Sequence, residues 1–376
     1  MPRILYVSRG YTCHDRRFLS AIAERSYDVH FLGLEPGGVA TDPRPLPERV
    51  QRVDWEQGRR PLQGPEAWLS LMPALEAVVE DIRPDLIHAG PVPSCGFLVS
   101  LLDAHPLLLM AWGSDILVDA ERDPLWQWLT RYALSRSDML LCDSDAVRHK
   151  VQQLAAYPDE RVVQFPWGVD LRTFRPGELG RAIRRRLGWD EALVVLSTRS
   201  WETAYGIETL LEAFAQAAQS EPRLRLLLLG TGSAREAVLR RLRREQLDEH
   251  VYCAGQVAPT DVLPYFQAAD VYLSCAPCDG TSVSLLEALA VGLPIIATDH
   301  PGNRAWVQPG LNGWLWTAGD PRGFATALVH ACQLTPSERE AIRQRNRWLA
   351  EERADWDRNV EQLFRAYGTL MEQVAA

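Results

Sequence analysis

Residues 271–299, VYLSCAPCDGTSVSLLEALAVGLPIIATD, have the pattern of one strand, one helix and a second strand. The apolar run at 271–276 is followed by turn residues and then by a helical pattern that ends at Gly292, just before Pro294. A glycine followed by a proline is a common helix stop. Another apolar run, at 294–299, comes next. A helix that joins two such strands lets them pair in parallel, so this stretch predicts a doubly wound α/β fold.

The same alternation extends over most of the chain. In the first half we predict a helix at 65–82 and strands at 3–8, 28–34, 85–90, 107–112, 139–144 and 161–167. In the second half we predict helices at 206–218 and 234–246, and further strands at 192–200, 224–230 and 251–255. The pattern therefore predicts two similar α/β arrays in tandem.

The boundary between the two arrays is predicted from segment 168–177, GVDLRTFRPG, which has no helix or strand period and carries turn residues. A chain of 376 residues also exceeds the usual size of a single core. We predict an N-terminal domain at 1–170, a C-terminal domain at 171–350 and a terminal helix at 351–376 that could pack back across the junction.

Composition excludes several classes of protein. With 47% hydrophobic and 24% charged residues, and without a leader pattern or a membrane-length apolar run, the sequence predicts a cytoplasmic protein and leaves peripheral membrane contact open. The net charge of -9 argues against nucleic acid as a partner. Cys275 and Cys278 form the one C-x-x-C pair among seven cysteines, and no second ligand pair accompanies them. No metal site, disulfide framework, Walker A motif or G-x-S-x-G motif is predicted.

Candidate binding residues follow the predicted strands, because ligands of open α/β sheets lie outside the carboxyl ends of the strands. Gly280, Thr281 and Ser282 would leave backbone N–H groups open at a helix start, which favours a phosphate or a sugar oxygen. Glu287 lies one turn further along, among apolar residues. It is either a solvated side chain or a carboxylate that accepts hydrogen bonds from a diol such as ribose.

Other strand ends carry weaker candidates. Arg199 is either a surface residue or a planar ligand for a diphosphate. Gly230 and Thr231 form part of a permissive G-T-G turn after the strand at 224–230.

In the first half, Gly10 follows the first strand, and Asp115 follows the strand at 107–112. We interpret Asp115 either as the N-cap of a short helix or as the polar group of a binding loop. His14 and His88 are interpreted as structural, because no nucleophile or metal set accompanies either of them.

The motifs resemble the retaining glycosyltransferases of family 4, the glycosyl transferases group 1. The resemblance rests on FPWGVDLRTFRPG (165–177), on Arg199 with the following GIETLLEAF (206–214), on LLLLGTGS (226–233) and VYCAGQV (251–257), and above all on DGTSVSLLEALAVGLPIIATDHPGNRAWVQPGLNGWLW (279–316). It implies the GT-B fold, in which two Rossmann-like domains with doubly wound parallel sheets face each other across a cleft. LLMAWGSDIL (108–117) and HDRRFL (14–19) support it in the first half.

The resemblance also assigns residue roles. Asp279 and Glu287 match the acid pair of the family, so Asp279 would lie near the donor sugar and Glu287 would hold the ribose. Arg199 would bind the diphosphate. The predicted catalytic residues are Arg199, Asp279 and Asp115, and the predicted donor-binding residues are Gly10, Gly230, Thr231, Val257, Gly280, Thr281, Ser282, Leu286 and Glu287.

The predicted function is transfer of a sugar from a nucleotide diphosphate sugar, of the UDP or GDP type, to a hydroxyl of a sugar, a lipid-linked molecule or a small molecule. The resemblance implies retention of configuration and no cofactor or metal. Two positions differ from the family pattern: Tyr205 stands where a second diphosphate-binding cation, a lysine, is usual, and Trp112 stands where many members have a histidine. Lys150 is the single lysine of the chain, so a second cation would have to come from Arg16, Arg17 or Arg304. Alternatives are a sugar-nucleotide-binding partner protein without activity and a sugar-nucleotide epimerase of the same fold.

Overall fold

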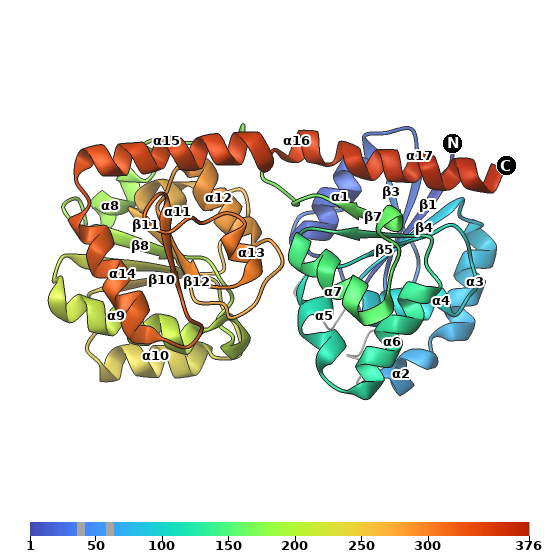
Figure 1. Ribbon diagram of the computed structural model, residues 1–376, viewed down its shortest axis with the longest axis horizontal. Helices are drawn as coiled ribbons and strands as arrows, with labels where there is room; N and C mark the ends of the chain where they lie inside the picture. Colours follow the sequence, from blue (N-terminus) through green and yellow to red (C-terminus); the bar gives the residue numbers. More distant parts are fainter. Residues whose placement is uncertain (36–41, 58–63, 376) are drawn as a thin grey trace. The chain divides into compact units, whose positions relative to one another are not determined.

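The computed structural model describes residues 1–35, 42–57 and 64–375. The chain divides into two compact units (Figure 1). The first comprises Met1–Phe165 together with Asn359–Ala376, and the second comprises Pro166–Arg358. The sequence predicts this boundary after residue 170 and does not predict where the terminal helix packs.

The first unit is built around a parallel sheet of seven strands in the order β3-β2-β1-β4-β5-β6-β7. Its strands are β1 (Arg3–Ser8), β2 (Asp28–Gly33), β3 (Val50–Arg52), β4 (Leu86–Ala89), β5 (Leu107–Met110), β6 (Met139–Cys142) and β7 (Val162–Gln164). Its helices are α1 (Cys13–Ala23), α2 (Pro65–Leu69), α3 (Met72–Ile82), α4 (Phe97–Ser100), α5 (Ser114–Leu117), α6 (Pro124–Ser135), α7 (Asp145–Ala155) and α17 (Glu361–Ala375), with short turns at Val92–Gly96, Asp119–Glu121 and Asp159–Arg161.

The second unit holds a parallel sheet of six strands in the order β10-β9-β8-β11-β12-β13. Its strands are β8 (Leu193–Ser197), β9 (Leu224–Leu229), β10 (Val251–Gly255), β11 (Val271–Ser274), β12 (Ile295–Thr298) and β13 (Gly313–Trp316). Its helices are α8 (Arg181–Leu187), α9 (Ile207–Ser220), α10 (Arg235–Arg244), α11 (Leu263–Ala268), α12 (Val283–Val291), α13 (Pro301–Arg304), α14 (Pro321–Gln333) and α15 (Pro336–Arg353), with a short turn at Thr203–Tyr205 and α16 (Trp356–Asn359) at the unit boundary.

In both sheets the first strand of the unit lies in the middle. The chain adds strands first on one side of it and then on the other, which is the strand order of a doubly wound Rossmann-like domain. The predicted α/β fold with two such domains is confirmed. Every strand predicted from the sequence is present, with its centre where the apolar run lies. The short edge strands β3 and β13 were not predicted.

The predicted helix at 65–82 is two helices, α2 and α3, with a break at Ser70 and Leu71. Pro73 explains the break, because proline has no N–H to continue a helix and is tolerated in the first turn of a new one.

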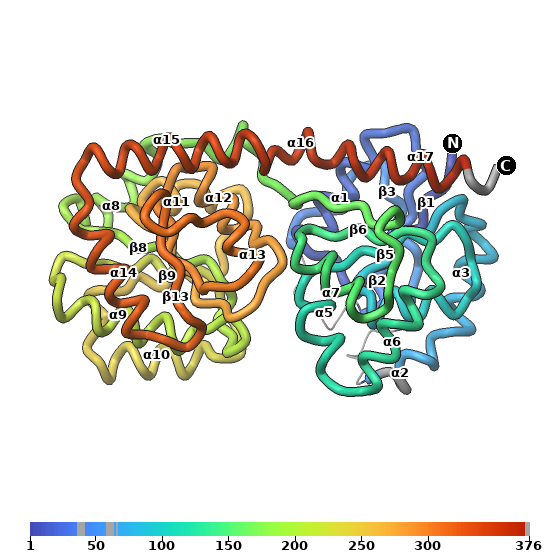
Figure 2. The backbone as a smooth tube through the Cα atoms, in the orientation of Figure 1, coloured from blue at the N-terminus to red at the C-terminus, as the bar shows by residue number. Residues whose placement is uncertain are grey.

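The cores lie on both faces of each sheet because parallel strands are covered on both sides. In the second unit, Val195 and Leu273 face one core with α9 and α14, whereas Leu196 and Tyr272 face the other with α12. In the first unit, α17 packs against β4, β6 and β7, although it lies at the far end of the chain (Figure 2). Tyr367 of α17 is fully buried, and its hydroxyl lies 2.7 Å from Nδ1 of His88.

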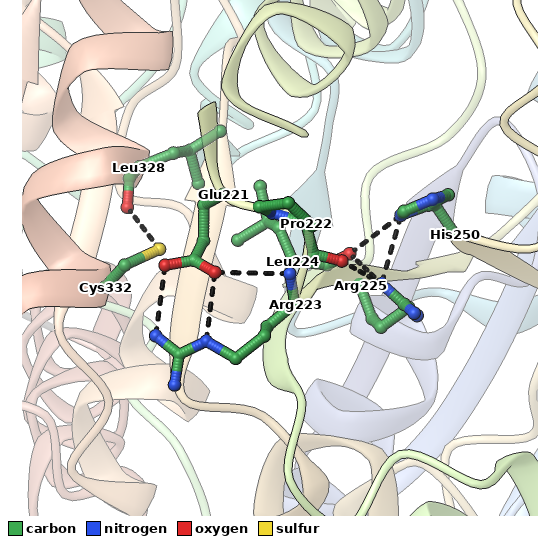
Figure 3. A network of polar contacts seen from close by, with 8 residues as sticks. All are labelled: Glu221, Pro222, Arg223, Leu224, Arg225, His250, Leu328 and Cys332. Carbon is green, nitrogen blue, oxygen red and sulfur yellow. Dashed lines mark hydrogen bonds and ion pairs between the residues drawn. The ribbon is translucent and has the colours of Figure 1, made fainter. Parts of the chain in front are cut away.

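The amino end of the second sheet is closed by local polar contacts (Figure 3). Arg223 donates from Nε and Nη2 to the Glu221 carboxylate, both at 3.0 Å. Arg225 donates from Nη1 to the carbonyl oxygens of Pro222 and Leu224 and lies 3.0 Å from Nδ1 of His250. These contacts fix the start of β9. They lie at the amino ends of the strands, opposite the carboxyl ends where ligands of such sheets bind.

Candidate functional site

The topological switch point of the second sheet lies between β8 and β11, which are neighbours although they are not consecutive in the chain. Open α/β sheets bind ligands outside the carboxyl ends of the strands at such a point. The loop after β8 carries Arg199, and the loop after β11 carries residues 279–282. The two most specific parts of the predicted site therefore lie at the same edge of the sheet.

Arg199 is the centre of this site. Its Nη2 lies 2.9 Å from Oδ2 of Asp279, and its Nη1 donates to Oγ of Ser282 at 3.0 Å. Both side chains of the ion pair are mostly buried, at 17% and 18% exposure. Burial lowers the pKa of Arg199 and the Asp279 charge raises it, and the net result is a raised pKa. Arg199 is therefore a fixed positive charge.

Tyr205 occupies the position where the family pattern has its second cation. The guanidinium carbon of Arg199 lies 4.4 Å from the centre of the Tyr205 ring. Gly206 makes this approach feasible: its φ is +71°, and a Cβ there would lie 2.1 Å from the carbonyl oxygen of Cys275. The aromatic face orients the guanidinium by a cation–π contact and adds no charge of its own.

The start of α12 faces Arg199. Ser282 is the N-cap residue, and its hydroxyl receives hydrogen bonds from Leu285 N, at 3.4 Å, and from Arg199. The cap bond is long by the usual standard of 2.7–3.2 Å. Gly280, Thr281 and Ser282 are buried at this end of the helix. The positive end of the helix dipole and the guanidinium thus act on the same place.

Glu287 lies on the open face of α12. Val283, Ser284 and Glu287 are half-buried, whereas Leu285, Leu286 and residues 288–291 are buried. The half-buried residues are three and four positions apart and share one helix face. Ser284 Oγ lies 2.7 Å from the Tyr272 hydroxyl and 3.1 Å from Ser282 Oγ. Glu287 therefore lies on the face that carries polar groups.

The remaining predicted donor-binding residues are distributed differently. Gly230 has a φ of +95°, and a Cβ there would lie 3.0 Å from the carbonyl oxygen of Arg199. Thr231 is exposed, and its carbonyl accepts from Trp201 N at 3.0 Å. Val257 is half-buried after β10. These three lie at the carboxyl edge of the sheet.

Leu286 lies in α12 beside Glu287. Its side chain is fully buried in the core, and its N–H donates to the Ser282 carbonyl at 3.1 Å. The side chain of Leu286 thus packs in the core below the site, and its predicted role in donor binding stays a prediction.

In the first unit, Gly10 is buried directly after β1, at the switch point between β1 and β4. Arg9 beside it donates from Nη2 to the Glu35 carboxylate at 3.0 Å. Of the side chains on α1, His14 lies 5.8 Å from the Trp112 ring, and Phe18 also packs edge-on against Trp112. Trp112 is held in an aromatic cluster at the end of β5.

Asp115 is 3% exposed and accepts a hydrogen bond from Val92 N at 3.0 Å. Its second oxygen, Oδ1, is buried without a hydrogen-bond partner. Burial raises the pKa of Asp115 to about 7, and the hydrogen bond from Val92 opposes that shift. The N-cap of the short helix is Gly113, so the interpretation of Asp115 as the N-cap is wrong. The carboxyl instead ties the loop after β5 to the loop after β4.

His300 is a residue that sequence reasoning missed. It follows β12, is 8% exposed, and its Nε2 is buried without a hydrogen-bond partner. Burial lowers its pKa, and the charges of Asp279 and Arg199 both act on it. The predicted position of the strand at 294–299 would have placed this histidine at the carboxyl edge of the sheet.

Within residues 1–35, 42–57 and 64–375 no group of three or more His, Cys, Asp or Glu side chains is arranged to hold a metal ion. Likewise, none of the described helices combines the length and apolar character needed to cross a membrane.

Models of two glycosyltransferase families match the two halves of the chain. The model described as "Glycosyl transferase 4-like" matches residues 3–144, and the model described as "Glycosyl transferases group 1" matches residues 191–333.

Curated relatives are similar over part of their length. The α-monoglucosyldiacylglycerol synthase of Streptococcus pneumoniae is 26% identical over 226 residues, which are 58% of this chain and 50% of the relative. The D-inositol 3-phosphate glycosyltransferase of Geodermatophilus obscurus is 30% identical over 260 residues, which are 65% of this chain and 55% of the relative. The alignments thus span about half the length of these relatives.

Solved structures resemble the whole chain. Sucrose-phosphate synthase from Thermosynechococcus elongatus has a TM-score of 0.83 at 19% identity, with 99% of this chain and 100% of that chain covered. Anabaena HepE in complex with UDP-glucose has a TM-score of 0.77 at 19% identity, with 98% and 100% covered. At this identity the likeness concerns the fold, which is the GT-B fold. Since the two family models account for most of both units and the fold agrees with them, the chain belongs to the family 4 glycosyltransferases.

Proposed function

We propose that this protein is a retaining, metal-independent glycosyltransferase that moves a sugar from a nucleoside diphosphate sugar to a hydroxyl of an acceptor. The observation that carries the proposal is the position of Arg199. It lies at the carboxyl end of β8, beside the start of α12, and contacts both Asp279 and Ser282. A planar cation and a helix N-terminus at one place suit a diphosphate.

Negative charge grows on the diphosphate as the bond to the sugar breaks. Arg199 and the N–H groups at the start of α12 would stabilise that charge, and both are in place before the reaction. This supply of positive charge supports transfer without a metal ion. Glu287, on the open face of α12, would accept hydrogen bonds from the ribose hydroxyls.

Asp279 has two roles in the proposal. Without donor, its carboxylate pairs with Arg199 at 2.9 Å and satisfies the buried guanidinium. A diphosphate that binds Arg199 displaces this carboxylate, which then accepts hydrogen bonds from hydroxyls of the sugar. The exchange keeps Arg199 paired in both states, so no buried charge is left without a partner.

Retention is proposed from the resemblance to the retaining glycosyltransferases of family 4. With donor bound, Asp279 accepts hydrogen bonds from sugar hydroxyls in this proposal and is not assigned as a nucleophile, so we propose a substitution on one face of the sugar in place of a covalent intermediate. In a substitution on one face of the sugar, the acceptor oxygen bonds to the anomeric carbon as the bond to the diphosphate breaks. A phosphate oxygen takes the proton of the acceptor hydroxyl. The released diphosphate therefore leaves with that proton.

We propose a UDP sugar as the first donor to test, since HepE of the same fold was solved with UDP-glucose.

The acceptor would be bound by loops 9–17 and 88–96 of the first unit. Polysaccharide, glycolipid or small-glycoside synthesis is the proposed setting. The names of curated relatives, which include a diacylglycerol glycoside synthase and an inositol phosphate glycosyltransferase, support the last two. Among the residues that the structure describes, no disulfide joins the cysteines, which supports a reducing compartment such as the cytoplasm.

The test is an assay of transfer and of donor hydrolysis with a panel of UDP and GDP sugars and with glycerolipid, inositol phosphate and sugar acceptors. Release of nucleoside diphosphate that depends on the acceptor supports the proposal, and the anomeric configuration of the product decides retention. Activity should survive treatment with EDTA. Tight donor binding without turnover would instead favour a sugar-nucleotide-binding partner protein, which Tyr205 and Trp112 motivate, and an isomerised donor would favour an epimerase.

A further inference from the structure

The proposed site holds one arginine where the family pattern has two cations. Tyr205, at the position of the second cation, stacks on Arg199 and carries no charge. Arg304, which the sequence suggested as a substitute, is exposed and donates from Nε and Nη2 to Asp299 at 2.6 and 3.1 Å. A diphosphate carries more negative charge than one guanidinium neutralises, so a polar side chain would add to the stabilisation given by Arg199 and the N–H groups at the start of α12.

His300 is placed to make that contact. The turn that it begins packs directly on the loop after β11: a Cβ on Gly302 would lie 2.0 Å from the carbonyl oxygen of Gly280 and 2.6 Å from that of Asp279. This close approach fixes the distance between the His300 turn and the Asp279–Gly280 backbone. The histidine thus belongs to the same loop cluster as Arg199 and the start of α12.

The side chain of His300 is buried and incompletely satisfied. It is 8% exposed, and Nε2 has no hydrogen-bond partner. A buried polar group without a partner destabilises the folded protein. Native proteins rarely keep such a group in a core, and its position beside the Arg199–Asp279 pair indicates a ligand atom as the partner.

We propose that His300 Nε2 donates a hydrogen bond to a phosphate oxygen of the donor and so supplies a second side-chain contact to the diphosphate beside Arg199. This inference rests on the proposed function, since it assumes that a nucleoside diphosphate binds at Arg199. The partner atom becomes available when the diphosphate displaces the Asp279 carboxylate from Arg199.

The test compares ligands with and without the diphosphate. Binding of UDP, GDP, uridine and guanosine is measured by isothermal titration calorimetry for the full chain and for His300→Leu, His300→Gln and His330→Gln. His330 is an exposed histidine on α14 of the same unit, which makes His330→Gln the matched control. We expect His300→Leu to weaken binding of the nucleoside diphosphate about tenfold and to leave the nucleoside unchanged. The amide of His300→Gln can still donate, so its affinity for the nucleoside diphosphate should lie between that of the wild type and that of His300→Leu.

Protonation gives a second readout. Four charged side chains act on His300: Asp279 and Asp299 raise its pKa, Arg199 and Arg304 lower it, and burial lowers it most. In the free protein the imidazole is therefore neutral near pH 6.5, and a bound diphosphate would raise its pKa. Binding of UDP should take up more protons in the wild type than in His300→Gln, measured from the dependence of the heat on the buffer. The titration of UDP itself is the same for both proteins, so the difference reports on His300.

The outcomes separate the two proposals. In the first outcome, the wild type binds UDP or GDP, Arg199→Ala weakens that binding and His300→Leu does not. The role of His300 is then overturned, and the proposed function stands. Equal weakening of diphosphate and nucleoside by His300→Leu, with a lower melting temperature, would show a structural role and also overturn it. If the wild type binds neither UDP nor GDP, both proposals fail. Should His300→Leu not fold, His300→Gln alone decides through its affinity and its proton uptake.

Discussion

Helices α1 and α12 both begin with a hydroxyl and an acid three residues apart, but the two ends are used in opposite ways. At α1, Asp15 N donates to Thr12 Oγ1 at 3.2 Å, and Thr12 N donates to Asp15 Oδ2 at 2.8 Å. The helix caps itself, and Asp15 is fully buried. At α12, Ser282 and Asp279 both turn to Arg199.

The order of the two residues explains the difference. In α1 the acid follows the hydroxyl by three positions, so its carboxylate reaches back to the N-cap N–H and forms a capping box. In α12 the acid precedes the hydroxyl, and the third residue of the helix is Leu285. Leu285 has no side chain that could reach back to the N-cap N–H as Asp15 does, so α12 has no capping box, although Ser282 still accepts from Leu285 N. The self-capped end is structural, and the other end is the proposed donor site.

Arg199→Ala should have the largest effect at the α12 end. It removes the positive charge at the place where the diphosphate develops negative charge, so we expect turnover to fall about a hundredfold or more. Steady-state kinetics with the best donor of the panel measures the change. Arg9→Ala is the comparison in the first unit: it should leave Glu35, 2% exposed, without its ion pair and lower the melting temperature. If Arg199→Ala lowers the melting temperature but leaves turnover unchanged, Arg199 has a structural role and the proposed role in catalysis is contradicted.

Asp115→Asn tests whether the buried acid of the first unit is structural. The folded-state pKa of Asp115, about 7, lies above its usual value, so the folded protein binds the proton more tightly than the unfolded chain. This tighter proton binding adds to the unfolding free energy at pH 4, by an amount on the order of a few kcal/mol, and the addition is lost as the pH rises to about 7. The asparagine can still accept from Val92 N and should flatten this dependence. Urea unfolding at pH 4.5 and pH 8 checks it, and an unaltered pH dependence in the variant would contradict the assignment.

The matched pair Thr12→Ala and Ser282→Ala tests the comparison most directly. Loss of the Thr12 hydroxyl should cost about 1–2 kcal/mol of unfolding free energy, since it removes a working N-cap. Loss of the Ser282 hydroxyl should cost less, about 0.5 kcal/mol, because its cap bond to Leu285 N is 3.4 Å long. Ser282→Ala should instead lower donor affinity, because Arg199 loses a hydrogen bond that orients it. If both variants lose the same stability and bind donor normally, the two helix ends do not differ in role.

The fold of both units and the place of the candidate site could be predicted from the sequence, because both depend on the local pattern of apolar and turn residues. The strands that carry Arg199 and Asp279 are apolar runs bounded by turn residues, and their carboxyl ends meet at the switch point by topology alone. Contacts made by the tertiary fold could not be predicted. The stacking of Tyr205 on Arg199 depends on the close packing of Gly206 against Cys275, and the burial of His300 depends on Gly302 against Gly280. The hydrogen bond from Val92 N to Asp115 could not be predicted for the same reason, since Val92 lies on another loop.

Substitution of Tyr205 should give the smallest effect, and it tests how firmly Arg199 is held. The guanidinium lies 4.4 Å from the ring centre, a contact worth about 0.5–1 kcal/mol at a partly exposed site. Tyr205→Phe keeps the ring face and should change the donor KM by less than about twofold, whereas Tyr205→Leu should raise it about threefold. Both values come from initial rates at varied donor concentration. Equal KM values for the two variants would mean that the ring face does not orient Arg199, and that Asp279 and Ser282 position the guanidinium without it.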